Sequence, residues 1–155
     1  MTESTTLHAT FTLEREYPVA PERVFAAWAD PVSKARWFAG SSESHELDFQ
    51  AGGREINRAT LDTGAEVTFA SVYHDIVDSQ RIIYSSTLSA SDHGLATVSL
   101  TTVELVAEGA GTRLTLTEQG TYLDGHEDPS WREQGTSDWL DKLAEEFTTS
   151  VETAR

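Results

Sequence analysis

The sequence predicts an α+β fold in which a curved antiparallel sheet of about six to seven strands wraps around one long C-terminal helix. Segments with a period of two fill the middle of the chain, and the loops between them are too short for parallel crossovers. A long helical pattern appears only near the C-terminus. Because the one large apolar helical face must cover the one large sheet, we expect the two to pack together.

The first strand is followed by two short helices. Residues 7–17 alternate between apolar and polar side chains, which is typical of a half-buried strand. Pro21 then stands where the first turn of a helix tolerates it, and Asp30 and Pro31 repeat the arrangement as a cap followed by a proline. We expect two short helices that meet at Asp30 and close one end of the sheet.

The remaining strands follow in the order of the chain. A glycine pair at 52–53 predicts a hairpin turn, and further segments rich in β-branched and aromatic residues predict strands. These segments are 45–50, 54–60, 65–76, 81–88 and 96–120, the last divided by a turn at 108–111. Within 97–106 the apolar residues change phase after Leu100, so we expect a bend or bulge near Thr101 and Thr102.

A stripe with a period of four predicts the long C-terminal helix. Ser130 and Glu133 have the spacing of a capping box, so we place the start of the helix near residue 130. A glycine inside a helix costs about 1 kcal/mol relative to alanine, so we expect a kink or a close approach at Gly135. The stripe consists of Trp131, Gly135, Trp139, Leu143, Phe147 and Val151, and Leu140 and Ala144 broaden it.

Composition limits the class of protein and its partners. With 155 residues, 38% of them hydrophobic, we expect one globular domain over residues 1–155. A formal charge of -15 repels nucleic acid and anionic lipid, and the absence of cysteine excludes thiol chemistry. No apolar run approaches the roughly 20 residues of a spanning helix, and the first residues do not form a signal peptide. We therefore expect a cytoplasmic protein.

A search for catalytic and metal-binding motifs finds none. The chain has no nucleophile elbow, zinc motif, P-loop or dinucleotide fingerprint. Residues 124–128 are acidic, but neighbours in a loop cannot all point at one ion. His74 and Asp75 are adjacent on a strand and point to opposite faces. We predict no catalytic residue, no metal and no cofactor.

Five spaced motifs together resemble the START-like, or SRPBCC, superfamily, and within it the branch of the activator of Hsp90 ATPase. They are "EYPVAPERVFAAWADPVSKARWF", "FQAGGRE", "SVYHDIVDSQRIIYS", "GTRLTLTEQG" and "GTSDWLDKLAEEF". The resemblance covers nearly the whole chain. It implies a helix-grip (START/Bet v1-like) fold, with a deep hydrophobic cavity between the C-terminal helix and the sheet.

The aromatic residues supply the candidates for a binding site. Rings at strand and helix periods usually form core, but buried tyrosine and tryptophan need partners for their polar atoms, which a cavity can supply. We also expect Trp37 and Phe38 at the cavity rim, because they follow the proline elbow. The predicted ligand-binding residues are Trp37, Phe49, Phe69, Ser71, Tyr73, Tyr84, Ser86, Trp131, Gly135 and Trp139.

Three functions remain open at this stage. The first is binding of a small hydrophobic or lipid-like molecule, which we rank above catalysis. The second is a cyclase, aromatase or hydrolase that uses the same cavity. The third, ranked last, is interaction with an Hsp90-type chaperone, because Hsp90 activators carry an additional N-terminal domain. The sequence does not decide whether the protein forms a homodimer.

Overall fold

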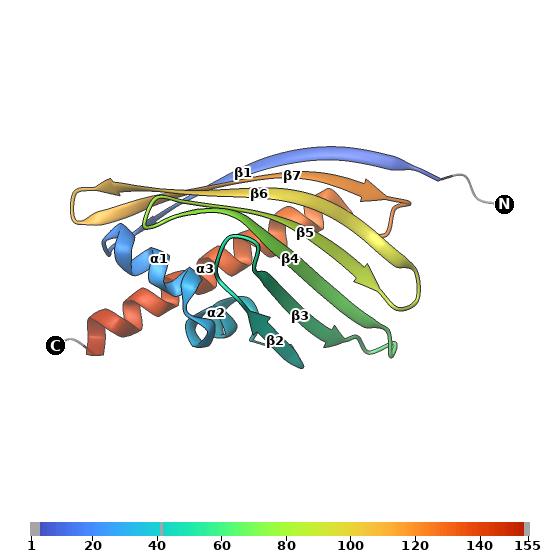
Figure 1. Cartoon of the computed structure of the whole chain (residues 1–155), viewed down its shortest axis with the longest axis horizontal. Coiled ribbons are helices and arrows are strands. Elements are labelled where there is room, and N and C mark those ends of the chain that lie inside the picture. The colour runs from blue at the N-terminus through green and yellow to red at the C-terminus, as the bar shows by residue number, and fades with distance from the viewer. Residues whose placement is uncertain (1–3, 41, 154–155) are drawn as a thin grey trace.

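Seven strands form an antiparallel sheet that grips one long helix in the computed structural model, which describes residues 4–40 and 42–153, with side chains as far as 148. Figure 1 shows α3 crossing one face of the curved sheet, with α1 and α2 on the same side. The strand order is β1-β7-β6-β5-β4-β3-β2, and the predicted fold class is confirmed. The elements are β1 (Thr6–Tyr17), α1 (Pro21–Ala29), α2 (Pro31–Phe38), β2 (Ser44–Leu47), β3 (Arg54–Thr60), β4 (Glu66–Val77), β5 (Arg81–Ala90), β6 (Gly94–Glu108), β7 (Gly111–Leu123) and α3 (Pro129–Thr153).

The two short helices begin at prolines, as predicted. Pro21 opens α1 and Pro31 opens α2, where a missing backbone N–H costs nothing. The Asp30 carboxylate caps α2 by accepting a hydrogen bond of 3.0 Å from the backbone N–H of Ser33. The two helices therefore meet at a capped proline junction.

The residue that caps the N-terminus of α3 is not the predicted one. The Asp128 carboxylate accepts hydrogen bonds from the backbone N–H of Ser130 at 2.8 Å and from its hydroxyl at 2.7 Å. Pro129 occupies the first helical position, so the cap falls one residue earlier. The predicted capping box between Ser130 and Glu133 is wrong.

The bulge expected near Thr101 and Thr102 of β6 is not found there. The pairing of β6 with β7 is unbroken from Thr97 to Glu108, and the pairing of β6 with β5 is regular over Thr101 and Thr102. The register shifts lie elsewhere: one leaves His74 of β4 unpaired with β5, and the other leaves Ala96 of β6 unpaired with β5. Val98 and Leu100 lie on the outer face, 41% and 40% exposed. From Thr97 onward the phase of β6 is constant, and the inward positions are Thr97, Ser99, Thr101, Val103 and Leu105.

The apolar core occupies one end of the interface between α3 and the sheet. The Tyr17 hydroxyl donates to the carbonyl oxygen of Leu140 at 2.9 Å, which fixes α3 against β1. Burying each large apolar side chain here contributes about 1.5–3 kcal/mol. The core includes Val24, Trp28, Ile82, Val103, Leu114, Leu116, Leu140, Leu143 and Phe147. Within the described residues, no helix is long and apolar enough to cross a membrane.

Candidate ligand-binding site

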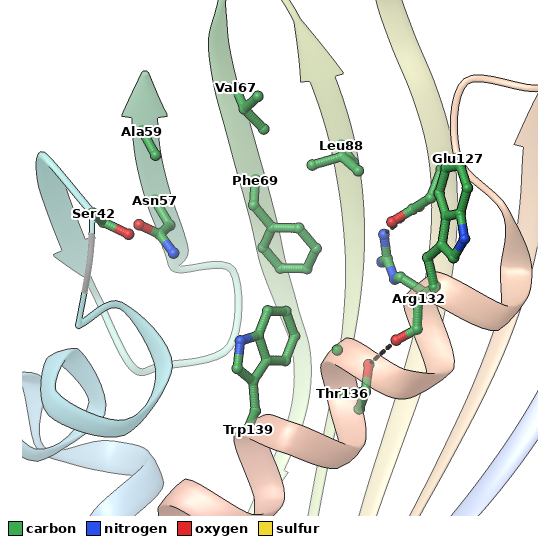
Figure 2. Close-up of a pocket in the computed structure, with 12 residues that line it drawn as sticks. Ser42, Asn57, Ala59, Val67, Phe69, Leu88, Glu127, Arg132, Thr136 and Trp139 are labelled. Carbon is green, nitrogen blue, oxygen red and sulfur yellow. Dashed lines mark hydrogen bonds and ion pairs between the residues drawn. The ribbon is translucent and has the colours of Figure 1, made fainter. Parts of the chain in front are cut away.

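A cavity of about 220 Å³ lies between the N-terminal half of α3 and strands β3, β4 and β5. Figure 2 shows its side chains reaching inward from α3 and from these strands. It lies beyond the apolar core, where α3 carries Arg132, Gly135 and Thr136 between two tryptophans. The lining residues are Ser42, Asn57, Ala59, Val67, Phe69, Leu88, Glu127, Trp131, Arg132, Gly135, Thr136 and Trp139.

Aromatic rings form the main apolar wall. Phe69 and Trp139 meet edge to face with ring centroids 5.9 Å apart, and Phe38 lies 4.5 Å from Trp139. Phe38 is only 7% exposed and supports the wall from α2. Trp131, in contrast, is 67% exposed at the edge of the cavity. The arrangement offers flat apolar surfaces inside and one exposed ring outside.

Gly135 keeps part of the cavity open. A Cβ atom added at this position would meet no heavy atom within 4 Å. The close approach expected at Gly135 is therefore wrong, and α3 runs continuously through it. A larger residue here would project into space that is now empty.

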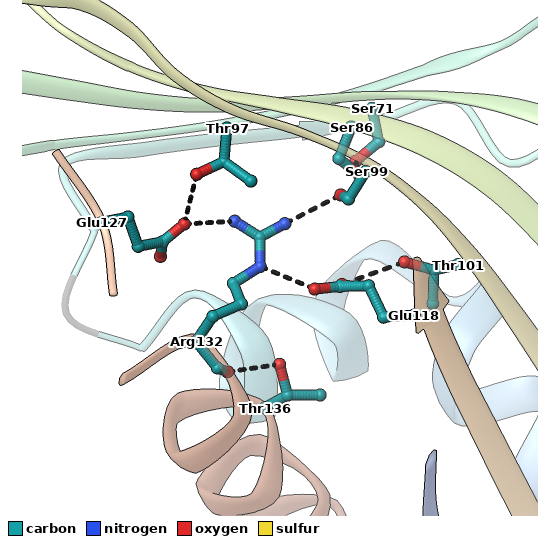
Figure 3. Close-up of polar contacts among 9 residues, drawn as sticks. All are labelled: Ser71, Ser86, Thr97, Ser99, Thr101, Glu118, Glu127, Arg132 and Thr136. Carbon is teal, nitrogen blue, oxygen red and sulfur yellow. Dashed lines mark hydrogen bonds and ion pairs between the residues drawn. The ribbon is translucent and has the colours of Figure 1, made fainter. Parts of the chain in front are cut away.

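Arg132 joins α3 to the sheet through a buried polar network, shown in Figure 3. Its guanidinium donates from Nε to Glu118 at 2.9 Å, from one terminal nitrogen to Glu127 at 3.1 Å and from the other to Ser99 at 2.9 Å. Burial by itself lowers the pKa of Arg132, but Glu118 and Glu127 raise it above its ordinary value. Arg132 therefore stays charged, with two carboxylates around it.

Inward hydroxyl groups complete this network. Thr97 donates to Glu127 at 2.6 Å, and Thr101 donates to Glu118 at 3.1 Å. Ser99 faces Ser86 across the β5–β6 pair, so a row of small side chains leaves room for the long Arg132 side chain. The polar side chains on the inner face of β6 therefore bond either Arg132 itself or the two carboxylates that hold it.

The opposite wall carries an amide without a partner. The Asn57 Oδ1 atom is buried and accepts no hydrogen bond from the residues that the structure describes. Figure 2 places Asn57 and Ser42 on one side of Phe69, with Arg132 and Glu127 on the other. A buried polar atom left in this state costs about 1–3 kcal/mol, which a ligand group could recover.

A second buried network lies behind the aromatic wall. Glu55 accepts hydrogen bonds from Lys34 at 2.8 Å and from the Tyr73 hydroxyl at 2.7 Å, and its other oxygen lies 2.7 Å from His45 Nε2. Burial alone would raise the pKa of Glu55, but Lys34 and the hydrogen bonds hold it at about 2. Burial lowers the pKa of Lys34, and Glu55 opposes that shift.

Aromatic rings enclose the Lys34 ammonium group. Its Nζ lies 5.0 Å from the Trp28 ring centroid, 5.3 Å from that of Trp37 and 4.5 Å from that of Phe38. Such contacts favour the cation by about 2 kcal/mol when it is desolvated. This network is therefore closed by protein groups and serves the packing of α2 on the sheet.

A family model for "Activator of Hsp90 ATPase homolog 1-like protein" matches residues 18–148. The chain belongs to this family. The match covers all the elements that form the cavity and both buried networks. A comparison with curated proteins finds no match to this chain.

Solved structures of similar bacterial proteins share the fold of this member of the activator of Hsp90 ATPase homolog 1-like family. The Mll3558 protein from Rhizobium loti is 43% identical, with a TM-score of 0.86 over 92% of this chain and 99% of that chain. An uncharacterized protein from Rhizobium leguminosarum is 37% identical, with a TM-score of 0.88 over 92% and 96%. Protein CV1439 from Chromobacterium violaceum is 26% identical, with a TM-score of 0.72 over 89% and 96%.

The structure brings four of the ten predicted site residues to the cavity of this family member: Phe69, Trp131, Gly135 and Trp139. The other six do not line it: Trp37, Phe49, Ser71, Tyr73, Tyr84 and Ser86. Trp37 is not at the expected rim, because its indole donates to the Ala27 carbonyl and packs on Trp28 at 4.8 Å. Ser71 and Ser86 instead bond each other at 2.7 Å.

The aromatic residues that miss the cavity form a continuous group of their own. Phe49 packs on Tyr73 with centroids 5.0 Å apart, and Tyr73 packs on Tyr84 at 5.6 Å. Tyr73 on β4 and Tyr84 on β5 point inward, but the strand period does not distinguish the core half of that face from the cavity half. Whether an inward ring borders the cavity or belongs to the core depends on its position along the strand.

Several lining residues were not predicted from the sequence: Ser42, Asn57, Glu127, Arg132 and Thr136. A signal for Arg132 was present, because Thr97, Ser99 and Thr101 alternate as inward polar residues opposite it. No comparable pattern marks Asn57, because its neighbours in the sequence of β3 are mostly polar. No group of three or more His, Cys, Asp or Glu residues in the described part of the chain could hold a metal ion.

Proposed function

We propose that the protein binds a small, mainly apolar molecule in the cavity between α3 and the sheet. The observation that carries the proposal is an open space of about 220 Å³ with walls of Phe69, Trp139 and aliphatic side chains. Family membership agrees with a ligand-binding domain. Binding pockets are typically apolar with a few converging polar groups, which here are Asn57, Glu127 and Arg132.

The volume indicates the size of the ligand. An engineered apolar cavity of about 150 Å³ holds benzene, whereas pockets for drug-sized molecules begin near about 300 Å³. A cavity of about 220 Å³ therefore suits a molecule of one or two rings. A long lipid chain would require the cavity to widen.

A titration with 2-naphthol tests this function. It is uncharged at pH 7 and has two rings, and amide chemical shifts in NMR spectra would report where it binds. The variant Gly135→Leu fills the open space, and Gln134→Leu is its matched control, since Gln134 is exposed on the same helix. We expect shifts in Phe69 and Trp139 for the wild type and for Gln134→Leu, with binding at least about tenfold weaker in Gly135→Leu.

Two results would contradict the proposal. One is the absence of saturable shifts in the wild type up to the solubility of 2-naphthol. The other is equal affinity in the wild type and in Gly135→Leu, which would place the binding outside the cavity.

Catalysis is the second candidate, because two titratable groups, Glu127 and Arg132, line the cavity. A carboxylate beside a bound substrate can act in general acid–base catalysis of a hydrolase, cyclase or aromatase reaction. Hydrolysis of 2-naphthyl acetate tests the hydrolase form, since its product is the proposed probe. Hydrolysis by the wild type that Glu127→Gln abolishes would support a hydrolase function. Equal rates of hydrolysis in the two proteins would exclude catalysis by Glu127.

Interaction with an Hsp90-type chaperone is the third candidate, and its support is the name of the family. The ATPase rate of the host chaperone, measured with and without this protein, tests it. If the protein does not raise the ATPase rate of the chaperone, this third function is excluded. A cytoplasmic location and a single domain over residues 1–155 also stay predictions, which cell fractionation and limited proteolysis would test. A homodimer stays one possible oligomeric state, which light scattering would test.

A further inference from the structure

We infer that the cavity selects uncharged ligands that carry a hydroxyl group and excludes carboxylates. This inference rests on the proposed function, and it concerns the charge of the ligand rather than its size. It follows from the charges that line the cavity and from the unpartnered amide on the opposite wall.

The charged wall has an excess of negative charge. Arg132 contributes one positive charge, and it is bonded to both Glu118 at 2.9 Å and Glu127 at 3.1 Å. Glu127 and Arg132 line the cavity, and Glu118 lies behind Arg132, so the three bonded groups together carry a formal charge of -1 beside the cavity. A ligand carboxylate would lose its hydration and would also meet this excess, and both effects disfavour it.

Arg132 is also largely occupied as a donor. Three of its nitrogens already donate to Glu118, Glu127 and Ser99, and its guanidinium carbon lies 5.1 Å from the centre of the Phe69 ring. Its side chain is 4% exposed. The two N–H groups that remain are on the terminal nitrogens that already bond Glu127 and Ser99, so a carboxylate could form a pair of bonds only by sharing those nitrogens with their present partners.

The polar group on the other wall suits a hydroxyl. Asn57 Oδ1 is buried and has no partner among the described residues. A hydroxyl both donates and accepts, so it can pair with the Asn57 amide in either orientation of that group. Figure 2 places Asn57 across the Phe69 and Trp139 rings from Glu127, so one ligand can lie on the rings with its hydroxyl away from the carboxylates.

Three probes with the same ring system separate these effects: naphthalene, 2-naphthol and 2-naphthoate. In the wild type at pH 7 we expect 2-naphthol to bind most tightly and 2-naphthoate at least about tenfold more weakly. Glu127→Gln removes one negative charge with little change of shape, so it should narrow the gap between 2-naphthol and 2-naphthoate to about threefold or less. Asn57→Leu should weaken 2-naphthol about threefold to tenfold and leave naphthalene unchanged.

The outcomes distinguish this inference from the proposed function. If none of the three probes binds the wild type, both are wrong. If 2-naphthoate binds as tightly as 2-naphthol, or more tightly, the cavity binds ligands but Arg132 dominates its charge, and the selectivity is wrong. The selectivity is also wrong if Glu127→Gln leaves the ratio of the affinities for 2-naphthol and 2-naphthoate unchanged. Circular dichroism and thermal unfolding would show that each variant is folded.

Discussion

The Arg132 guanidinium on α3 and the Glu118 carboxylate on β7 lie 2.9 Å apart, and their side chains are only 4% and 5% exposed. This ion pair joins the helix to the sheet at the end where the apolar core stops and the cavity begins. Charged groups inside a fold are expensive to bury, and here they stand beside an open space and form part of its wall.

The first prediction concerns this ion pair. Arg132→Met leaves Glu118 and Glu127 without their cation, so we expect the free energy of unfolding to fall by about 3–5 kcal/mol. Arg113→Met is the matched control, because the Arg113–Glu108 pair has a similar distance of 3.0 Å but lies at the surface, 44% and 38% exposed. It should cost at most about 1 kcal/mol. Urea unfolding measures both, and equal losses would contradict the assignment of Arg132 as a buried charge.

The second prediction concerns the pair between Lys34 and Glu55. Lys34→Met should lower the free energy of unfolding by about 3–5 kcal/mol, since it leaves the Glu55 carboxylate buried without a cation. Adding Glu55→Gln removes that charge, so the double variant should be more stable than Lys34→Met alone. Chemical unfolding of the three variants tests the coupling. Losses that simply add would show that the two groups act independently.

Acid should weaken the fold through Glu55. Its pKa of about 2 in the folded protein lies below the ordinary value of 4.5, so the unfolded chain takes up the proton first as the pH falls. The stabilisation is therefore complete above about pH 5 and decreases toward pH 2. Tyr73→Phe removes one hydrogen bond to the carboxylate. The unfolded chains of the wild type and Tyr73→Phe titrate alike, so the difference in stability between the two proteins should hold above about pH 4 and shrink only as the pH falls toward the folded pKa of about 2. A difference that stays constant down to pH 2 would contradict this account.

Two glycines should respond to alanine in opposite ways. Gly135→Ala should raise the free energy of unfolding by about 1 kcal/mol, because its Cβ meets no atom within 4 Å and alanine favours the helix. Gly120→Ala should lower it, because its Cβ would lie 2.8 Å from Cε1 of Tyr122. Thermal and urea unfolding would measure both. A destabilised Gly135→Ala would show that the space beside Gly135 is filled.

Local patterns were sufficient to predict most of the fold. Proline at the start of α1 and α2 and the cap at Asp30 act over a few residues, and the structure confirms them. The strand periods also predict the seven strands, although the segment expected over 45–50 forms a strand only as far as Leu47. The interpretation of β6 failed for a physical reason. Its inward residues Thr97 and Ser99 are polar because they bond groups from α3 and its preceding loop, and a pattern that assigns apolar residues to the interior cannot show this.

The cavity was harder to predict than the fold. Phe69 and Tyr73 lie on the same face of β4, yet only Phe69 borders the open space, because the core fills the region around Tyr73. Which part of an inward face stays open depends on how far the sheet curves from α3. That distance is set by long-range packing, which a single sequence does not reveal.

A crystal structure of the protein with 2-naphthol tests the central claim most directly. The account predicts electron density for two fused rings against Phe69 and Trp139, with the hydroxyl oxygen within hydrogen-bond distance of the Asn57 amide. A cavity without ligand density, in crystals where 2-naphthol is bound elsewhere or not at all, would contradict it.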